Sequence, residues 1–485
     1  MVCEAEQRLY AEFISARRTA EAASVIAHVN GPDGGRYPLT GVGDVNTYAL
    51  FAETISQITH TTGRAGFIVP TGIATDDSTK AFFGDITQNG RLVSLYDIEN
   101  REKLFAAVDS RMKFCLLTLG AAAQAEFVCF ATQVSQLVDP RRRFTVTPDE
   151  FRLINPNTLT CPMFRSERDA ELTKKLYRAA PVLVEEGKPY GNPWGISFLA
   201  MMHMSSDSHL FADKPATGQL PLYEAKMVHQ FDHRWATYTP DGNSRDVSEA
   251  EKADPDYTVT PRYWVSEAEV NARLNSKNWD RGWLMGWRDI CRATDERTVI
   301  AGVVAKVGVG NKMPLFLFTS EITAHKAAAF YANLCALTLD FAARQKIGGT
   351  TLNYFYLKQF PILPPGRYCE ADLAFIVPRV LELTYTAHDL APWAQELGYS
   401  GQPFAFGPIR RAQLRAELDA YYAQLYSLNR DELRYILDPA AIEGPDYPSE
   451  TFRVLKKSEE RDFDEYRTQR LVLEAWDKLE RGELA

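Results

Sequence analysis

Residues 63–119 constrain the fold most, because short apolar runs alternate there with segments of helical spacing. The run FIV at 67–69 follows two glycines and ends at Pro70, a pattern typical of a buried strand with a functional loop at its end. A second apolar run occupies residues 114–119. We therefore expect two buried strands in this segment.

Apolar residues recur at helical intervals over residues 47–58, directly before the first predicted strand. The local order is thus helix, strand, helix, strand, as in an α/β sheet whose ligand loops lie at the strand ends. The residues before this helix are too few for the strands that would complete such a sheet. The sequence therefore predicts an α/β fold with a partial doubly wound sheet.

The composition indicates a folded protein with room for about three domains. The chain has 485 residues, 45% of them apolar and 12% aromatic, which allows large cores. It contains no run of the ~20 apolar residues that a membrane span needs, and its first residues do not resemble a secretory signal. We expect a cytoplasmic location. The seven scattered cysteines predict neither a disulfide framework nor a zinc cluster.

The net charge of −9 is unevenly distributed along the chain. Residues 1–135 carry 11 Lys and Arg against 15 Asp and Glu, residues 136–365 carry 28 against 26, and residues 366–485 carry 15 against 22. Only the middle part is not acidic. Its small excess of positive charge does not make a basic patch by itself.

Changes in sequence character predict three domains, at 1–135, 136–365 and 366–485. The segment VDPRRRF at 138–144 is a plausible linker, and a Pro-Pro pair at 364–365 marks the second boundary. The middle part has short apolar runs and long polar loops, which favour a mixed α+β domain. Ala- and Leu-rich spacing predicts a helix over 326–345 and a largely helical C-terminal region.

Five stretches resemble the C-terminal part of large N6-adenine DNA methyltransferases, of the restriction-modification type that fuses methyltransferase and target recognition domain. The stretches are GRYPLTGVGDVNTYALFAE, GRAGFIVPTGIATDD, LVSLYDIENREKLFAAVDSRMKFCLLTL, PLYEAKMVHQFDHRWATY and LNYFYLKQFPILPP. They occur in the family's order and span most of residues 35–365. The resemblance implies a methyltransferase sheet in residues 1–135, followed by a target recognition domain.

The family's two catalytic motifs are absent from this sequence. An FxGxG loop holds S-adenosylmethionine, because glycines let the backbone approach the cofactor. An NPP-aromatic loop holds the flipped adenine. The segment most similar to the NPP-aromatic motif is Asn192-Pro193-Trp194, which lacks one proline and lies after the predicted strands. S-adenosylmethionine is thus implied by the family, while its binding motif is missing, and we expect no DNA methylation by this chain alone.

The resemblance implies roles for several residues of the first domain. Phe105 matches an aromatic residue that packs against the extruded base, and such stacking is worth about 1–3 kcal/mol. The alternative is that Phe105 is the apolar end of a helix. Asp44, Asn46 and Tyr48 lie where the family's chain passes the active-site cleft, although an N-capping role for Asp44 or Asn46 is favoured.

Double-stranded DNA is the expected partner, together with an upstream polypeptide that completes the methyltransferase. Lys, Arg and Asn interleaved with aromatic residues suit phosphate and base-edge contacts. The candidates for DNA contact are Lys226, Arg234, Arg292, Lys306, Lys312, Arg344, Lys346 and Lys358. For any one of them a solvated surface is the simpler alternative. The glycine-containing loop from Lys306 to Lys312 and the region from Arg344 to Lys358 are favoured.

Two further constellations have simpler alternatives. His229 and His233 stand four residues apart, which on a helix would present both to a metal, but no third ligand is near in sequence. Asp213 followed by Glu224 and Lys226 has the order of a magnesium-dependent nuclease site. Short patterns of both kinds arise often by chance, and neither is favoured.

The sequence therefore predicts the recognition-bearing portion of a site-specific DNA adenine-N6 methyltransferase, inactive without a donor-binding half. The alternative is a non-catalytic DNA-binding specificity subunit. A metal-dependent nuclease is a third, less favoured possibility.

Overall fold

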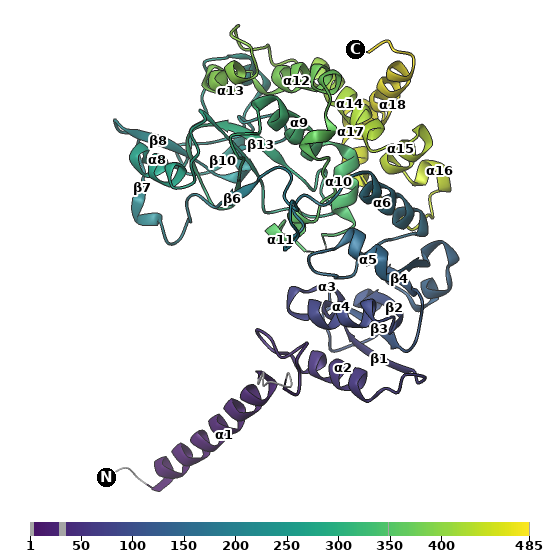
Figure 1. Ribbon diagram of the computed structural model, residues 1–485. Helices are drawn as coiled ribbons and strands as arrows, with labels where there is room; N and C mark the ends of the chain where they lie inside the picture. Colours follow the sequence, from purple (N-terminus) through teal and green to yellow (C-terminus); the bar gives the residue numbers. More distant parts are fainter. Residues whose placement is uncertain (1–3, 29–34, 348, 485) are drawn as a thin grey trace. The chain divides into compact units, whose positions relative to one another are not determined.

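The computed structural model describes residues 4–28, 35–347 and 349–484 (Figure 1). The chain divides into two compact units, residues 1–174 and 175–485. The sequence instead suggests boundaries near 135 and 365. The first unit extends further because strand β5 (Phe144–Val146) joins its sheet and helix α5 (Pro148–Ile154) joins its core.

Among its described residues, the first unit contains one five-stranded sheet with the order β1-β3-β2-β4-β5. The other strands are β1 (Ala65–Pro70), β2 (Leu92–Glu99), β3 (Lys113–Leu119) and β4 (Ala125–Ala131). β3 runs antiparallel to both β1 and β2, so β1 and β2 are parallel to each other. β2 is also parallel to β4. The two predicted strands are thus present as β1 and β3, within a mixed α/β sheet.

Helices α2 (Thr47–Ile58), α3 (Gly72–Thr75) and α4 (Lys80–Gln88) accompany this sheet. α4 lies between β1 and β2 in sequence and buries Phe82, Phe83 and Ile86 completely. The side chain of Asn46 accepts a hydrogen bond from the first turn of α2, which confirms the N-capping interpretation. The apolar pattern of α4 therefore supplies one face of the core.

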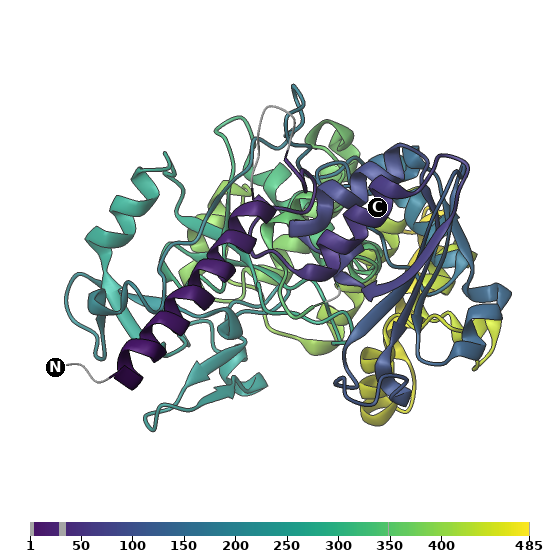
Figure 2. The same ribbon diagram turned by 90° about the horizontal axis from the view of Figure 1, so that it is seen from below.

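Helix α1 (Glu4–His28) is one continuous straight helix (Figure 2). Its Leu9, Tyr10 and Phe13 side chains are each more than half exposed. Exposed ion pairs one turn apart, such as Arg8 with Glu12 at 3.0 Å, add a few tenths of a kcal/mol each, roughly. Helix α1 thus leaves its apolar residues in solvent.

Strand β1 forms an edge of the sheet, because among the described residues it pairs only with β3. Ile68 of β1 is 55% exposed, and helix α2, which packs on β1, exposes 68% of Phe51 and 75% of Ile58. We call β1 together with Phe51 and Ile58 the open edge. Its outer side has no paired strand among the described residues, and uncovered apolar side chains flank it.

The second unit contains two four-stranded sheets and a hairpin among its described residues. The orders are β14-β8-β11-β7 and β13-β12-β15-β6, and β9 pairs with β10. The strands are β6 (Ser197–Leu199), β7 (Phe211–Ala212), β8 (Gln219–Tyr223), β9 (Ala236–Tyr238), β10 (Ser244–Asp246), β11 (Tyr263–Ser266), β12 (Trp283–Trp287), β13 (Ala301–Ala305), β14 (Gly308–Val309) and β15 (Leu315–Leu317). The expected mixed character of this region is thus present.

Helices cover much of the remaining chain. They are α6 (Glu167–Ala179), α7 (Glu249–Ala253), α8 (Glu267–Asn275), α9 (Ala324–Cys335), α10 (Leu337–Arg344), α11 (Tyr354–Lys358), α12 (Glu370–Thr384), α13 (Ala391–Glu396), α14 (Pro408–Leu425), α15 (Arg430–Leu437), α16 (Ala440–Glu443), α17 (Arg453–Phe463) and α18 (Arg467–Glu480). The helix predicted over 326–345 is broken into α9 and α10 by the extended backbone of Ala336. None of the helices that the structure describes is long and apolar enough to cross a membrane.

The C-terminal helices share a core with the rest of the second unit. Asn333 of α9 donates to the hydroxyl of Tyr426 at 2.9 Å, and that hydroxyl donates to the carbonyl of Pro361 at 2.5 Å. Both Asn333 and Tyr426 are completely buried. These bonds join segments on both sides of residue 365, and one compact unit includes both segments.

Asp340 of α10 is the centre of a buried ionic network. Its carboxylate accepts hydrogen bonds from Arg344 at 2.7 Å and Arg297 at 3.1 Å, and from the backbone N–H of Thr298 at 2.9 Å. The side chain is fully buried. Despite the opposing effect of burial, the two guanidinium groups hold the pKa of Asp340 below its usual range.

Asp419 of α14 gives a prediction on pH dependence. Burial raises the pKa of this carboxyl to about 6, although it accepts the N–H of Leu337 at 2.7 Å. Between about pH 4 and pH 6 the folded protein keeps a proton that the unfolded chain releases, so the contribution of Asp419 to stability falls as the pH rises. Asp419→Asn removes the titrating carboxyl, so the variant does not lose this contribution to stability as the pH rises. Urea unfolding at about pH 4.5 and about pH 6.5 should show the variant gaining stability relative to wild type at the higher pH. A difference that does not change with pH would contradict it.

Candidate nucleic-acid interface

The carboxyl ends of β1 and β2 are held together by one buried acid. Asp97 near the end of β2 accepts the hydroxyl of Thr71 at 2.6 Å and the backbone N–H of Phe130 at 3.0 Å. It is completely buried, and burial raises its pKa. Because Thr71 directly follows β1, these bonds hold the carboxyl ends of β1, β2 and β4 together at the same end of the sheet.

The loop after β2 is organised by Asn100, which is also completely buried. Its amide donates to the carbonyl groups of Phe105 at 3.0 Å and Val108 at 3.1 Å, and its oxygen accepts the N–H of Phe105 at 3.0 Å. These bonds hold residues 100–112 in a defined turn rather than a helix. The alternative that Phe105 ends a helix is therefore not what the structure has.

Phe105 lies in an apolar patch on this loop. Its ring packs edge-on against Phe114 at 4.8 Å between centroids, and 42% of the residue is exposed. Leu104, Val108 and Met112 are each at least 40% exposed as well. One side of the ring is thus supported while another is accessible, and its role in stacking a base stays a prediction.

Four segments of the second unit form a cluster at the end of β12, which we call the loop cluster: residues 225–228, 288–292, 310–313 and 350–353. The backbone N–H of Asp289 donates to the carbonyl of Lys312 at 3.1 Å, and the N–H of Leu352 donates to the carbonyl of Asp289 at 2.6 Å. Arg288 donates from Nε to the carbonyl of Val228 at 2.7 Å. The cluster is therefore a connected arrangement of loops positioned by the sheet.

Basic and apolar groups are exposed together on the loop cluster. Lys226 and Arg292 are exposed, and Lys312 pairs with Asp289 at 2.9 Å while keeping half of its side chain in solvent. Ile290, between them in sequence, is 61% exposed. Cations suit phosphate contacts, and an exposed aliphatic group suits contact with a thymine methyl.

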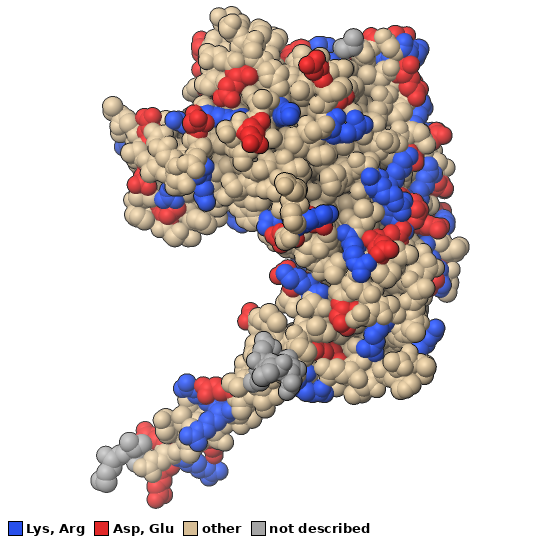
Figure 3. Space-filling model, viewed as in Figure 1, with Lys and Arg blue, Asp and Glu red and all other residues tan. Residues whose placement is uncertain are grey.

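Charges of both signs are spread over the surface of the protein. Figure 3 shows Lys and Arg interspersed with Asp and Glu over the face in view. Burial lowers the pKa of Arg288 to about 10, which leaves it charged at neutral pH. DNA binding at the loop cluster would therefore depend on a few defined contacts rather than on a broad basic field.

Three of the candidate DNA-contacting residues lie in the interior of the second unit. Arg234 is 1% exposed and donates to four backbone carbonyls. Arg344 is 7% exposed and binds Asp340 and further carbonyls, and Lys346 is 9% exposed and donates to the carbonyl of Gln359 at 2.7 Å. Their donors form hydrogen bonds inside the protein, so in the folded chain these three side chains are not part of the candidate interface.

Lys306 is separated from the loop cluster, and Lys358 is engaged in an ion pair. The N–H of Lys306 donates to the carbonyl of Gly282, before the start of β12, whereas Lys312 lies beside Asp289, after its end. At about 3.3 Å per residue, the length of β12 places these positions roughly 20 Å apart. Lys358 forms an ion pair with Glu186 at 2.5 Å. The segment from Lys306 to Lys312 therefore does not present one surface.

His229 and His233 do not lie on a helix. His229 exchanges backbone hydrogen bonds with Asp232 in a tight turn whose Phe231 has a φ of 61°, and His233 bonds Asp389 at 2.9 Å. The part of the chain that the structure describes holds no group of three or more His, Cys, Asp or Glu able to bind a metal. In the Asp213 and Glu224 constellation, Glu224 accepts the hydroxyl of Tyr238 at 2.5 Å.

The Asn192-Pro193-Trp194 segment is a structural turn. Asn192 donates to the carbonyl of Ile196 at 2.9 Å and accepts its N–H at 3.0 Å. The indole of Trp194 is fully buried and donates to the carbonyl of Leu363 at 3.1 Å. Because its amide and ring are both engaged internally, this segment is not placed to hold a flipped base.

No motif in the sequence marks Arg288, Asp289 or Ile290 as functional. The available signal was their position directly after the buried apolar strand Trp283–Trp287, where functional loops often lie. What makes them a cluster is contact with segments more than fifty residues away in the sequence, which periodicity does not reveal.

Comparison with solved structures gives partial likenesses, two of which are described here. The chain matches no protein-family model, and it matches no curated protein. The structure of the type IIG restriction endonuclease BpuSI is similar with a TM-score of 0.28 and 12% identity, over 84% of this chain and 51% of that one. The type IIL restriction-modification enzyme MmeI, solved in complex with DNA, gives a TM-score of 0.36 and 10% identity, over 82% and 52%.

The chain spans about half the length of each of these two enzymes. Likenesses of this size assign neither family nor activity. The function proposed for this chain therefore rests on its own residues and their geometry.

Proposed function

We propose that this chain is the DNA-recognition portion of a site-specific adenine-N6 DNA methyltransferase of a restriction-modification system. A separate polypeptide segment would supply the loops that bind S-adenosylmethionine and the flipped adenine. The complete enzyme would transfer the donor's methyl group to adenine N6. The first unit would complete the catalytic sheet, and the second would select the DNA site.

The open edge is the observation that carries this proposal. Natural proteins protect edge strands with charges, bulges or covering elements. β1 reads AGFIVP and carries no charge. Ile68, Phe51 and Ile58 are all more than half exposed beside it. An uncharged edge with flanking apolar groups suits a neighbouring strand and a helix from another segment, as expected of a half sheet.

The strand ends support the same reading. Parallel strands of an α/β sheet bind ligands in the crevice at their carboxyl ends. β1 and β2 are parallel, so the turn at Thr71 and the loop that contains Phe105 lie at the same end of the sheet. Asp97 of β2 accepts a hydrogen bond from the hydroxyl of Thr71 there. In the proposed enzyme this end of the sheet faces the catalytic cleft, where Phe105 would contact the extruded base.

The residues present do not fit the methyl donor. The sequence has no FxGxG loop. The glycine at the end of β1, Gly72, has its Cβ position occupied by the carboxylate of Asp76, whose Oδ2 lies 2.3 Å away, with the hydroxyl of Tyr48 at 3.3 Å. This glycine allows close internal packing and leaves no cradle for a cofactor. We therefore assign no step of methyl transfer to this chain alone.

Reconstitution tests the catalytic part of the proposal. The chain would be co-expressed with the polypeptide encoded immediately upstream, and purified DNA incubated with S-adenosylmethionine would be analysed for N6-methyladenine by mass spectrometry. We expect methylation by the pair and none by either component. Methylation by this chain alone would contradict the proposal, as would the absence of both association and methylation in the pair.

DNA binding by the loop cluster gives a separate prediction. The double variant Lys226→Gln with Lys312→Gln is expected to weaken duplex binding about equally for all sequences. It should also reduce the slope of log affinity against log salt by about 0.9 for each phosphate contact removed. Fluorescence anisotropy across a salt series measures both quantities.

Lys277→Gln is the matched control, because Lys277 is exposed and lies before the start of β12, away from the loop cluster. An unchanged salt slope in the double variant would exclude the loop cluster as the phosphate-contacting surface. Selective DNA binding that is unaffected by S-adenosylmethionine, combined with no methylation in the reconstituted pair, would instead identify a non-catalytic specificity subunit.

A further inference from the structure

The segment VDPRRRF at 138–144, which has the composition of a linker, is folded onto the sheet of the first unit. One turn of 3-10 helix (Pro140–Arg142) follows β4 and contacts it. β5 then pairs antiparallel with β4, with Phe144 opposite Phe127. This register places Arg142, two residues before Phe144, near the carboxyl end of β4. The loop after β2 lies at the same end of the sheet, because β2 and β4 are parallel.

Phe130, the next-to-last residue of β4, has an unusual backbone conformation. Its φ is 59°, in the left-handed region that residues other than glycine rarely adopt. Its N–H donates to the buried carboxylate of Asp97 at 3.0 Å, which helps to hold this conformation. Strain of this kind persists where the surrounding contacts fix it, and it is concentrated at functional sites. The end of β4 is therefore a candidate functional position.

Two cations lie over the half-buried ring of Phe130. The Nζ of Lys113 is 4.6 Å from the ring centroid, and the guanidinium carbon of Arg165 is 4.2 Å from it. Arg165 also lies close to Arg142. Burial lowers the pKa of Arg142, the carboxylate of Asp139 opposes this, and the positive charge of Arg165 lowers the pKa further. Three positive charges thus gather at the end of β4, and we call Phe130, Lys113, Arg142 and Arg165 the Phe130 cluster.

Contact with an aromatic ring positions a cation and leaves its charge in place. The ammonium of Lys113 makes no hydrogen bond or ion pair among the residues that the structure describes. The carboxylate that attracts it, Asp97, is completely buried and already accepts two hydrogen bonds. The guanidinium of Arg142 makes no hydrogen bond in the described part of the chain, its contact with Asp139 is long, at 4.0 Å, and 14% of its side chain is exposed. Donors of Lys113 and Arg142 are therefore available to a ligand.

The exposed carboxylates nearby are occupied by other groups. Arg141 binds both oxygens of Asp139, with Nε donating to Oδ1 at 3.0 Å and Nη2 to Oδ2 at 2.8 Å. Glu99, at the end of β2, pairs with Arg101 at 2.9 Å. The positive charges at the end of β4 are thus only partly balanced.

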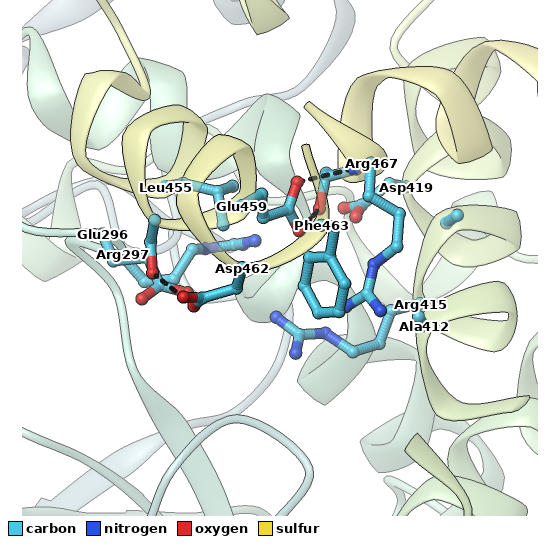
Figure 4. Close-up of a pocket in the computed structure, with 13 residues that line it drawn as sticks. Glu296, Arg297, Ala412, Arg415, Asp419, Leu455, Glu459, Asp462, Phe463 and Arg467 are labelled. Carbon is cyan, nitrogen blue, oxygen red and sulfur yellow. Dashed lines mark hydrogen bonds between the residues drawn. The ribbon is translucent and has the colours of Figure 1, made fainter. Parts of the chain in front are cut away.

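The cavity that α14, α17 and α18 line in the second unit differs in its charges (Figure 4). Among the described residues that line it are four carboxylates, including those of Asp419 and Glu459, and three guanidinium groups. Acidic groups therefore outnumber basic groups in this cavity. An anion is better matched by the Phe130 cluster.

We propose that the Phe130 cluster binds a phosphate group in the backbone of double-stranded DNA. Lysine and arginine form charge-assisted hydrogen bonds with phosphate oxygens, and a guanidinium fork binds two of them at once. Such contacts fix the register and orientation of a duplex without reading its sequence. The cluster would hold the DNA backbone at the end of the sheet that carries the loop of Phe105. The inference rests on the proposed function, to which it adds a DNA contact in the first unit.

Removing two of the charges tests this contact in the full chain. Lys113→Gln combined with Arg142→Gln is expected to weaken binding to a duplex of mixed sequence about tenfold or more, because two charge-assisted contacts are lost. The slope of log affinity against log salt should also fall by about 0.9 for each phosphate contact removed. Fluorescence anisotropy across a salt series measures both quantities, and the Tm of the variant reports its folding. An unchanged affinity or an unchanged salt slope in a variant with the Tm of wild type would overturn the proposal.

Chemical protection of the wild-type chain tests the same contact without a variant. Acetylation by N-hydroxysuccinimide acetate, followed by mass spectrometry, measures the reactivity of Lys113. Duplex DNA should lower the acetylation of Lys113 and leave that of the exposed Lys277 unchanged. Equal acetylation of Lys113 with and without DNA would overturn the proposal, even if the double variant does not fold.

Arg152→Gln is the matched control, because the side chain of Arg152 is 55% exposed and pairs with Asp149 at 2.6 Å. It lies on α5 of the same unit, which follows the end of β5 that pairs with the amino end of β4. This variant should bind DNA with the affinity and the salt slope of wild type. An equal loss in the control and in the double variant would overturn the proposal.

Failure of this inference and failure of the proposed function give different results. Methylation by the reconstituted pair, with DNA binding unchanged in the double variant, would overturn the inference alone. Weaker binding with a lower salt slope in the double variant, and no methylation by the pair, would support the phosphate contact and contradict the assignment as a methyltransferase.

Discussion

Replacing Asp340 with alanine is expected to lower the free energy of unfolding by about 3–5 kcal/mol, because it leaves two buried cations without their counter-charge. Arg297 and Arg344 both point at this carboxylate, at 3.1 Å and 2.7 Å, and the exposure of each is below 8%. The variant also leaves the N–H of Thr298 without its acceptor. The midpoint of urea unfolding at neutral pH is the measurement.

Asp256→Ala is the control for this loss, since the side chain of Asp256 is 83% exposed and surface changes usually stay within about 0.5 kcal/mol. Asp340→Asn should fall between the two, because it keeps an acceptor but removes the charge. An Asp340→Ala variant as stable as the control would show that the network contributes nothing. The same network explains why Arg344 is not available to DNA.

The double variant Phe51→Glu with Ile58→Glu is expected to abolish association with the sheet-completing polypeptide. Burying a large apolar side chain is worth about 1.5–3 kcal/mol, so losing two such contacts weakens binding by roughly 10²- to 10⁴-fold. Both residues are mostly exposed in this chain, so its own folding should not change. Co-purification and calorimetric titration measure the association, and Tm of the isolated variant measures its folding.

Ile409→Glu provides the matched control, because Ile409 is 75% exposed on α14 of the second unit. Undiminished association of the double variant would mean that the open edge is not the docking surface. The proposal of a half sheet would then lose its main support, whereas DNA binding by the loop cluster would be untouched.

The sequence predicts the first unit better than it predicts the candidate interface. The apolar runs of β1 and β3 and the N-cap at Asn46 depend on neighbouring residues, so local patterns reveal them. The place of β3 between β1 and β2 depends on non-local pairing, and periodicity gives no information about it.

Buried cations show the limit of sequence reasoning most clearly. Arg234 and Arg344 stand among polar and aromatic residues, as a DNA-binding residue would. Whether such a side chain reaches solvent is decided by acceptors from distant segments, such as the carbonyl of Thr451, which binds Arg344 at 2.8 Å. The loop cluster is not predictable from the sequence for the same reason, since its segments meet only in the folded chain.

The open edge also bears on how this chain behaves in the cell and in the test tube. A bare, uncharged strand can pair with any other unpaired strand, including β1 of a second molecule, and such pairing leads to aggregation. Keeping the chain soluble would then require its partner to be present as it is synthesised. Production on its own should therefore give poorer yields of soluble protein than production together with the partner.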